Sequence, residues 1–259
     1  MGSVYKILTD ETSNTKFSKS AEHEYMIVGL SLAQASLSGF NVCPSSSAAC
    51  RLHCVGKQGM AGAFPSVLRS RIKKTQRFLG DLQAGYELIE RDLDKALKIA
   101  DKTGRRVACR LNVFSDLPHE QMRRGLFEKF ARVQFFDYTK IRARYSAWLA
   151  GELPKNYHLT FSRSENNETD CIRFLISGGS VAIPFHVTPQ QSFNALQLSE
   201  LPTRWKGFPV VSGDENDLRF LDRPNSVIAL TAKGTLRYDN TDFVAQPKAH
   251  PGSVLDNLM

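Results

Sequence analysis

The sequence has no long apolar run, and this absence excludes the simplest class of membrane protein. A helix that spans a bilayer needs about 20 consecutive apolar residues, and no apolar segment of the 259 residues is that long. The first residues, MGSVYKILTDETSNTKF, contain no apolar signal core, so secretion is not expected. We therefore expect a cytoplasmic protein without a membrane partner.

Several short enzyme motifs are also missing. The chain has no G-x-x-x-x-G-K-[ST] phosphate loop, no G-x-S-x-G nucleophile elbow and no H-x-x-x-H pair among its six histidines. P-loop nucleotide hydrolases, ordinary serine hydrolases and the common zinc proteases are therefore poor fits. The net charge of +8, from 34 basic and 26 acidic side chains, permits a polyanionic partner such as nucleic acid.

Hydrophobic periodicity predicts an α/β fold. Residues 25–36 are mostly apolar, and residues 64–101 repeat apolar side chains at helical steps, with a break at Gly80 and Asp81 and an end at Gly104. Helical sequence also occupies 115–131 and 139–150. Short apolar segments follow one another roughly every 20–28 residues, which is the spacing of strand–helix units in a parallel sheet; they are 106–113, 132–138, 157–161, 180–185, 208–212 and 226–231.

We expect one α/β domain over residues 25–245, between a loose N-terminal lead-in (1–24) and a C-terminal tail (246–259). A TIM-barrel-like fold or a partial (β/α) barrel with parallel strands is our first interpretation, and a doubly wound open sheet is the second. In either fold the active site lies at the carboxyl ends of the strands.

Polar residues gather at those predicted strand ends. We expect substrate or cofactor binding there, with Asp116 and His186 as candidates for proton transfer. The plainer interpretation is that these residues form turns and helix caps. The binding candidates are Asn112, Ser115, Thr139, Lys140, Ser162, Arg163, Ser164, Asp214, Asp217 and Lys233.

Three of the five cysteines lie within twelve residues, as Cys43, Cys50 and Cys54 in a C-x6-C-x3-C pattern. An odd cysteine count in a long chain without a signal sequence disfavours disulfides. Three thiolates on one loop suit a [4Fe–4S] cluster with one open iron position. Zinc is an alternative that needs a fourth ligand such as His53, Cys109 or Cys171. Buried thiols without metal are the third interpretation.

The position of this loop, after the first strand of a predicted barrel, is similar to that in radical S-adenosylmethionine enzymes. Their usual spacing is C-x3-C-x2-C, which this sequence lacks. The likeness is therefore one of placement and not of motif.

The order of several blocks resembles the phage gene product 88-like proteins. The blocks include SLAQASLSGFNVCPSSSAACRLHC, RLNVFSDLPHE, LTFSRSE and VVSGDENDLRFLD, and together with the others they run from about residue 30 to 244. The resemblance implies a bacteriophage origin, hence the cytoplasm of a bacterial host, and makes Cys43, Cys50 and Cys54 family cysteines. It implies no defined reaction.

A compact basic segment stands apart from these features. On a helix, Arg69, Lys73 and Arg77 share one face at steps of four residues. They either contact phosphates or form a solvated face balanced by acids such as Asp81 and Glu87.

Two functional hypotheses follow. The first is a phage-encoded [4Fe–4S] metalloenzyme whose open iron site, at the barrel mouth, takes a small-molecule substrate or S-adenosylmethionine. The second is a nucleic-acid-associated binding protein with a structural metal, either zinc or iron–sulfur.

Overall fold

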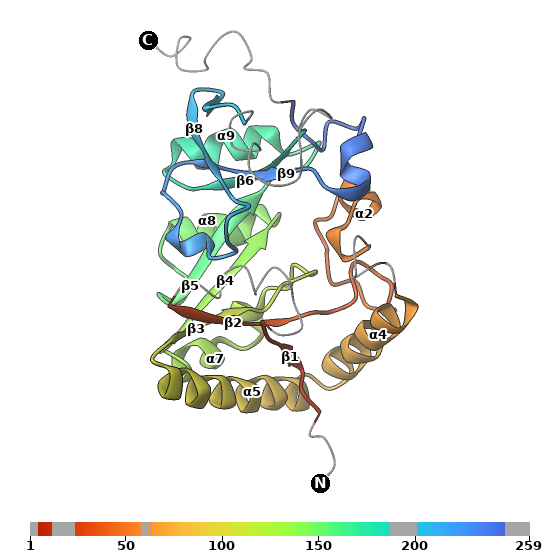
Figure 1. The fold of residues 1–259 in the computed structure, drawn as a ribbon, viewed down its shortest axis with the longest axis vertical. Coiled ribbons are helices and arrows are strands. Elements are labelled where there is room, and N and C mark those ends of the chain that lie inside the picture. Colours follow the sequence, from red (N-terminus) through yellow and green to blue (C-terminus); the bar gives the residue numbers. More distant parts are fainter. Residues whose placement is uncertain (1–4, 12–23, 58–61, 63, 187–200, 247–259) are drawn as a thin grey trace.

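The fold is built on an open nine-stranded sheet (Figure 1). The computed structural model describes residues 5–11, 24–57, 62, 64–186 and 201–246. Across the sheet the order is β1-β2-β3-β4-β5-β6-β9-β8-β7. In chain order the strands are β1 (Leu8–Thr9), β2 (Tyr25–Leu30), β3 (Arg106–Arg110), β4 (Val133–Thr139), β5 (Tyr157–Ser162), β6 (Val181–Phe185), β7 (Arg204–Trp205), β8 (Phe208–Ser212) and β9 (Val227–Thr231).

Parallel pairing dominates the sheet. Every pair from β2 through β6 and β9 to β8 is parallel, and only the edge pairs β1–β2 and β8–β7 are antiparallel. The expectation of an α/β fold with a mainly parallel sheet is therefore confirmed. The described strands do not close into a barrel, because β1 and β7 form two separate edges.

The helices α4 to α8 lie within the segments where apolar periodicity predicts helix, and α2 and α9 are additional. They are α2 (Ala48–Leu52), α4 (Pro65–Gly80), α5 (Leu82–Thr103), α6 (His119–Met122), α7 (Arg124–Lys129), α8 (Arg142–Leu149) and α9 (Glu168–Ile176), with short 3-10 turns η1 (Val55–Lys57), η3 (Arg219–Leu221) and η4 (Gly234–Tyr238). The predicted break is confirmed: the Asp81 carboxylate accepts the Ala84 N–H at 3.0 Å at the start of α5. Gly104 ends α5 with a φ of 67°, a left-handed conformation that glycine adopts without strain.

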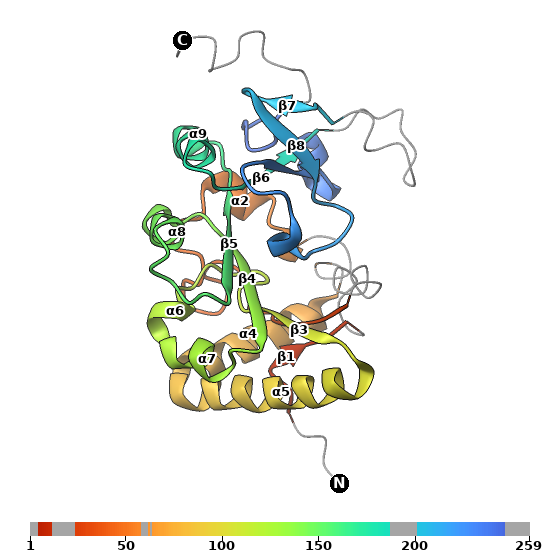
Figure 2. The ribbon, with the colours of Figure 1, turned by 90° about the vertical axis from the view of Figure 1, so that its left-hand side faces the viewer.

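The helices between consecutive strands share one side of the sheet. Strands β2, β3, β4, β5 and β6 follow each other in chain order, and right-handed crossovers in one direction place every connecting helix on the same face. Figure 2 shows α7, α8 and α9 on one side of the strands. A doubly wound sheet would run outward from an inner first strand in both directions, so that second interpretation is wrong for this chain.

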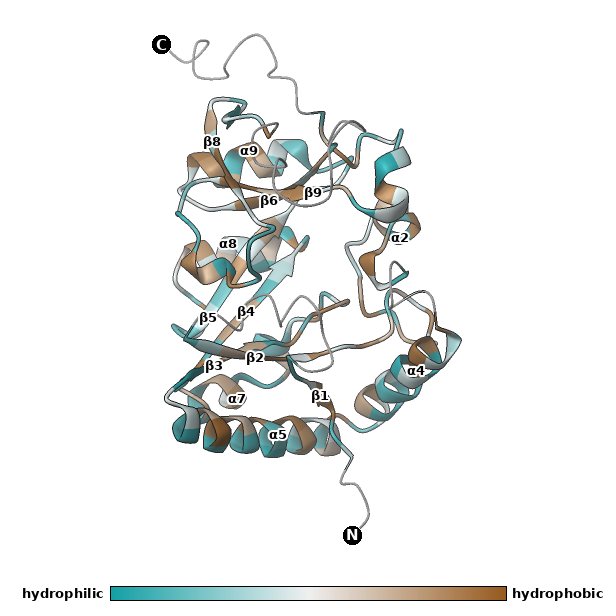
Figure 3. Ribbon diagram, in the orientation of Figure 1, coloured by the Kyte–Doolittle hydropathy of each residue, from teal (hydrophilic) through white to brown (hydrophobic). Residues whose placement is uncertain are grey.

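The main core lies between the sheet and these helices. It includes Val28, Phe135, Leu159 and Ile183, which are almost or completely inaccessible to solvent. Figure 3 shows the matching pattern, with hydrophobic ribbon along β6 and β9 and alternating hydrophobic and hydrophilic turns in α5. A smaller cluster covers the opposite face, where the Phe220 ring of η3 meets the rings of Tyr25 and Phe136 edge-on.

Several described elements lie where the sequence predicted none, among them β1, α2, β7 and α9. β1 falls inside the expected lead-in, where Ile7 is fully buried and the N–H groups of Ile7 and Leu8 donate to the Asp92 carboxylate at 2.7 and 3.2 Å. Helix α9 follows β5 directly and carries Cys171 into the main core. Within the sheet, β9 lies between β6 and β8 although β8 precedes it in the chain.

Candidate functional site

The three clustered cysteines lie on one segment, residues 42–57, which we call the cysteine segment. It follows β2, the first of the parallel strands, and contains α2 and η1. It contacts the loop after β3, because the Asp116 N–H donates to the Val42 carbonyl at 2.8 Å and the Cys43 Sγ lies 3.5 Å from the Phe114 carbonyl. The cysteine segment therefore lies at the carboxyl end of neighbouring parallel strands.

Cys43, Cys50 and Cys54 are free, partly buried thiols. Burial is the main cause that raises the pKa of Cys43 to about 12, and the charges of Cys54 and Cys50 raise it further. Burial and the charge of Cys50 also raise the pKa of Cys54. The three thiols therefore act on one another electrostatically within the cysteine segment.

The backbone near two of these sulfurs acts on their pKa. A hydrogen bond from the Ala35 backbone acts to lower the pKa of Cys43, and one from Gly56 acts in the same way on Cys54. Gly56 also allows close packing, since a Cβ at this position would lie 2.9 Å from the Gln34 Oε1. N–H groups directed at thiolate sulfurs are among the features that stabilise iron–sulfur clusters.

Glu165, after β5, holds the start of α2. Its carboxylate accepts the Ser47 hydroxyl at 2.6 Å and the Ala49 N–H at 3.1 Å, while the Ser47 hydroxyl caps α2 by accepting the Cys50 N–H at 3.1 Å. Burial acts to raise the pKa of Glu165, but these hydrogen bonds outweigh it and the pKa is lowered. An ionised carboxylate therefore orders the turn that carries Cys50.

Lys140 and Ser162, both expected from the sequence, meet beside the cysteines. The Lys140 ammonium donates to the Ser162 hydroxyl at 2.6 Å and lies 5.6 Å from the centre of the Phe243 ring. Its charge acts to lower the pKa of Cys54 and of Cys171. This cation is placed to compensate negative charge at the cysteine segment.

The polar residues after β3 are occupied in building their own loop. The Asn112 side-chain carbonyl accepts the Ser115 hydroxyl and the Leu117 N–H, both at 2.8 Å. The Asp116 carboxylate accepts the Lys140 N–H at 2.7 Å and the Arg144 guanidinium at 2.8 Å. For these residues the geometry matches the plainer interpretation of turns and caps.

The remaining strand-end residues are spread over separate contacts. Thr139 accepts the Ile141 N–H at 3.0 Å, and Arg163 donates to the carbonyls of Asp242 and Phe243 at 2.7 and 3.1 Å. The Ser164 hydroxyl bonds the Asn166 side chain at 2.9 Å.

Four more predicted residues, Asp214, Asp217, Lys233 and His186, make contacts outside the cysteine segment. Lys233 pairs with Asp214 at 2.7 Å, and Asp217 pairs with Arg110 at 2.9 Å. The backbone N–H of His186 donates to the Ala245 carbonyl at 2.9 Å. Nothing in these contacts brings His186 to the cysteine segment.

The expected fourth ligands are engaged elsewhere. The His53 ring nitrogens lie 3.2 Å from the Asp239 carboxylate and 3.2 Å from the Thr235 hydroxyl. Cys109 is fully buried in β3, and Cys171 is fully buried and donates to the Asn167 side chain at 3.5 Å. Within the described ranges, no group of three or more His, Cys, Asp or Glu side chains is arranged to hold a metal ion.

A buried charged network on the sheet face opposite the helices was not predicted. The Arg110 guanidinium lies 4.7 Å from the centre of the Tyr138 ring and pairs with Asp217. Arg219 of η3, only 1% exposed, lies 3.2 Å from the Asp222 carboxylate. Arg110 lies inside an apolar strand pattern, so its sequence context indicated core and not a polar site.

The basic residues Arg69, Lys73 and Arg77 are all exposed on α4. They line a shallow surface groove together with Tyr5, Ser66 and Ser70.

Fold and site together define an α/β protein that carries a three-cysteine segment after the first parallel strand of an open sheet. The family model of Gene product 88 matches residues 6–247. The chain therefore belongs to the Gene product 88 family, a family of phage gene products. Neither the curated proteins nor the solved structures contain a match. In the described part of the chain, no helix combines the length and the apolar character that a membrane crossing requires.

Proposed function

We propose that this chain is a phage iron–sulfur protein in which Cys43, Cys50 and Cys54 hold a [4Fe–4S] cluster. The observation that carries the proposal is the presence of three free thiols within twelve residues, on one segment at the carboxyl end of a parallel sheet. Soft thiolates are the ligands that iron–sulfur clusters use. The expected host compartment, bacterial cytoplasm, is reducing and keeps such thiols from forming disulfides.

The surroundings of the thiols suit an anionic cluster. The backbones of Ala35 and Gly56 act to lower the pKa of Cys43 and Cys54, and the charge of Lys140 acts in the same direction on Cys54. The raised thiol pKa values mean that metal binding must displace protons, as it does in other thiolate sites. Zinc would need a fourth protein ligand, and His53 and Cys171 already have other partners.

When bound, a [4Fe–4S] cluster supplies one-electron transfer, and with three thiolate ligands it keeps one iron position for a small ligand. We propose S-adenosylmethionine as the first candidate for that position. Support comes from the sequential strand order β2 to β6, which suits a partial (β/α) barrel, and from the position of the cysteine segment after β2. The C-x6-C-x3-C spacing differs from the usual radical S-adenosylmethionine pattern.

Charged residues around this site would orient the ligand and compensate its negative charge. Lys140, held by Ser162, offers an ammonium group to an anionic part of the ligand. Arg163 fixes the backbone of residues 242 and 243 next to Lys140. Asp116 positions Lys140 and Arg144 through its carboxylate, so we assign it positioning in place of proton transfer.

Cysteine variants test the cluster directly. Cys50→Ala in anaerobically prepared protein should lower bound iron and sulfide strongly, while the protein stays folded. Cys171→Ala is the matched control, because Cys171 is a buried core thiol outside the cysteine segment, and it should leave the iron content unchanged. If the wild type, Cys50→Ala and Cys171→Ala all bind equal iron, the cysteine segment does not hold the cluster.

The open position has its own test. Addition of S-adenosylmethionine to the reduced protein should change the electron paramagnetic resonance spectrum of the cluster. An unchanged spectrum with full iron content would reject S-adenosylmethionine as the ligand and leave the cysteine assignment standing.

A further inference from the structure

Helix α4 presents an exposed basic face. It contains five basic residues and no acidic residue between Pro65 and Gly80. Arg71 and Lys74 turn inward: Arg71 donates to the Gly56 carbonyl at 3.1 Å, and Lys74 donates to the Ile7 carbonyl at 2.7 Å. The other three, Arg69, Lys73 and Arg77, face solvent.

Among the described residues, no carboxylate pairs with these three cations. Asp81 and Glu87, the acids that could have balanced them, serve other roles: Asp81 caps α5, and Glu87 accepts a hydrogen bond from Gln83 at 2.8 Å. The interpretation of a charge-balanced helix face is therefore not supported.

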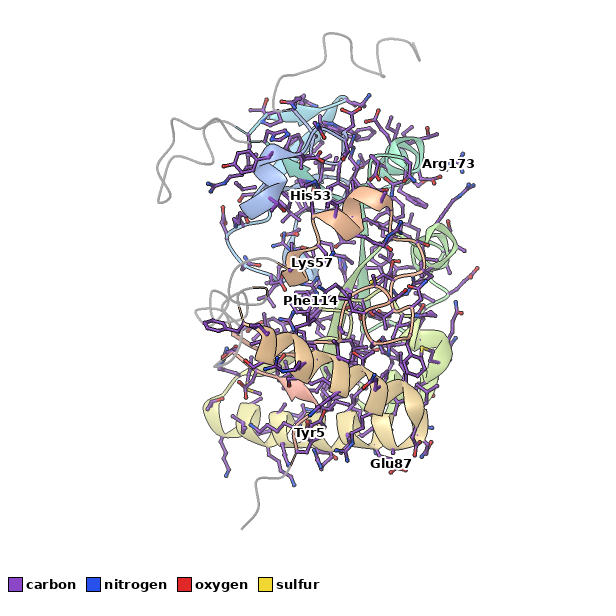
Figure 4. All side chains as sticks on the ribbon, turned by 90° about the vertical axis from the view of Figure 1, so that its right-hand side faces the viewer. Tyr5, His53, Lys57, Glu87, Phe114 and Arg173 are labelled. Carbon is purple, nitrogen blue, oxygen red and sulfur yellow. The ribbon has the colours of Figure 1, made fainter. Side chains whose placement is uncertain are left out.

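The groove along this face combines charge with an aromatic ring. Its lining consists of Tyr5, Ser66, Arg69, Ser70, Lys73 and Arg77. The Tyr5 side chain is exposed, and the Arg77 guanidinium lies 4.6 Å from the centre of its ring. Figure 4 shows α4 crossing this side of the molecule between Tyr5 and Lys57.

We propose that the α4 groove binds the sugar–phosphate backbone of single-stranded nucleic acid. Residues four apart on a helix lie about 6 Å apart along its axis, so the three cations form a row that can follow successive phosphates. The serine hydroxyls add donors for phosphate oxygens, and an exposed aromatic ring offers a surface on which a base can stack. An interfacial membrane helix would need aliphatic side chains in the groove, and its lining has none.

The salt dependence of binding tests the proposal. A fluorescent oligo(dT) strand of about 20 nucleotides is titrated with the full chain, and binding is followed by anisotropy. Three phosphate contacts predict a slope of log K against log salt of about −2, so affinity falls about 20-fold between roughly 50 and 200 mM salt. Arg69→Gln with Lys73→Gln leaves one contact, a slope of about −0.7 and a loss of about threefold over the same range.

The matched control changes the same net charge on another surface. Lys98 and Lys102 are also exposed and four residues apart, but they lie in the last turns of α5, at the end remote from α4. Lys98→Gln with Lys102→Gln should keep the wild-type slope. Ser70→Glu, which places a carboxylate in the groove, is a second variant that should weaken binding.

Three results would overturn the proposal. They are no binding at about 50 mM salt, equal losses in the α4 and α5 variants, or binding to vesicles with anionic lipid but not to the oligonucleotide. The α4 groove contains no cysteine. Iron content is therefore measured on the same samples, so that failure to bind nucleic acid is distinguished from failure to hold the cluster.

Discussion

His119 is the residue whose burial has the clearest consequence for stability. It is completely inaccessible to solvent, and its Nδ1 lies 2.9 Å from the Tyr86 hydroxyl. Burial, together with the positive charge of Arg144, lowers its pKa to about 3. The ring is therefore neutral in the folded protein, whereas in the unfolded chain it takes up a proton near its ordinary pKa of about 6.5.

Folding stability should consequently fall as the pH falls from about 6.5 toward 3, because the unfolded state binds the extra proton. One such proton contributes up to about 1.4 kcal/mol per pH unit. His119→Gln keeps an acceptor for the Tyr86 hydroxyl without titrating, so its stability should fall less steeply. Urea unfolding at several pH values measures both curves, and parallel curves would contradict the assignment.

The contacts of Glu165 with α2 lead to a second prediction for a single residue. Glu165→Gln removes the charge that orders the start of α2, which should cost about 1 kcal/mol of local stability. In the metal-free protein, alkylation of Cys50 should then become about fivefold faster, as followed by mass spectrometry. Glu168→Gln is the control, since Glu168 pairs with Arg163 and Lys206 outside the cysteine segment. Equal alkylation rates in both variants would show that Glu165 does not order α2.

The partnership of Glu165 with Ser47 could not be read from the sequence. The two residues are 118 positions apart, and local patterns carry no information on such a contact. The cysteines themselves were identifiable because three of them lie within twelve residues, a cluster that stands out in a chain with only five.

At the scale of elements, the junction of α4 and α5 depends on a close approach at Gly85. A Cβ there would lie 2.6 Å from Phe78 Cδ2 and 3.0 Å from the Phe78 carbonyl oxygen. Gly85→Ala should therefore destabilise the protein by about 1–3 kcal/mol, measured by chemical unfolding. Gly80→Ala, at the end of α4 where no atom lies within 4 Å of the added Cβ, should leave stability unchanged or raise it slightly. Equal effects of the two changes would contradict the close packing.

Elements with strong local signals were predictable. The period of apolar residues, the Asp81 cap and Gly104 placed α4 and α5, and apolar runs placed all seven parallel strands, β2 to β6, β8 and β9. β1 was missed because two residues carry no period, and α9 because it begins within the polar sequence ENNETD.

For the whole molecule, the position of β9 between β6 and β8 was beyond reach of the sequence. Strand order depends on contacts between distant residues, which local sequence patterns do not report. The parallel sheet itself was predictable, because regular strand–helix spacing permits few other arrangements. That sheet brings the loops after β2, β3 and β5 to the carboxyl end of its strands, where the cysteine segment lies.

Metal analysis of the wild-type chain, purified without oxygen, shows directly whether the cysteine segment holds a [4Fe–4S] cluster. We predict a brown protein with broad absorbance near about 400 nm and about four irons and four sulfides per chain. A colourless protein with one zinc and no iron would contradict the account, as would a well-folded protein free of both metals.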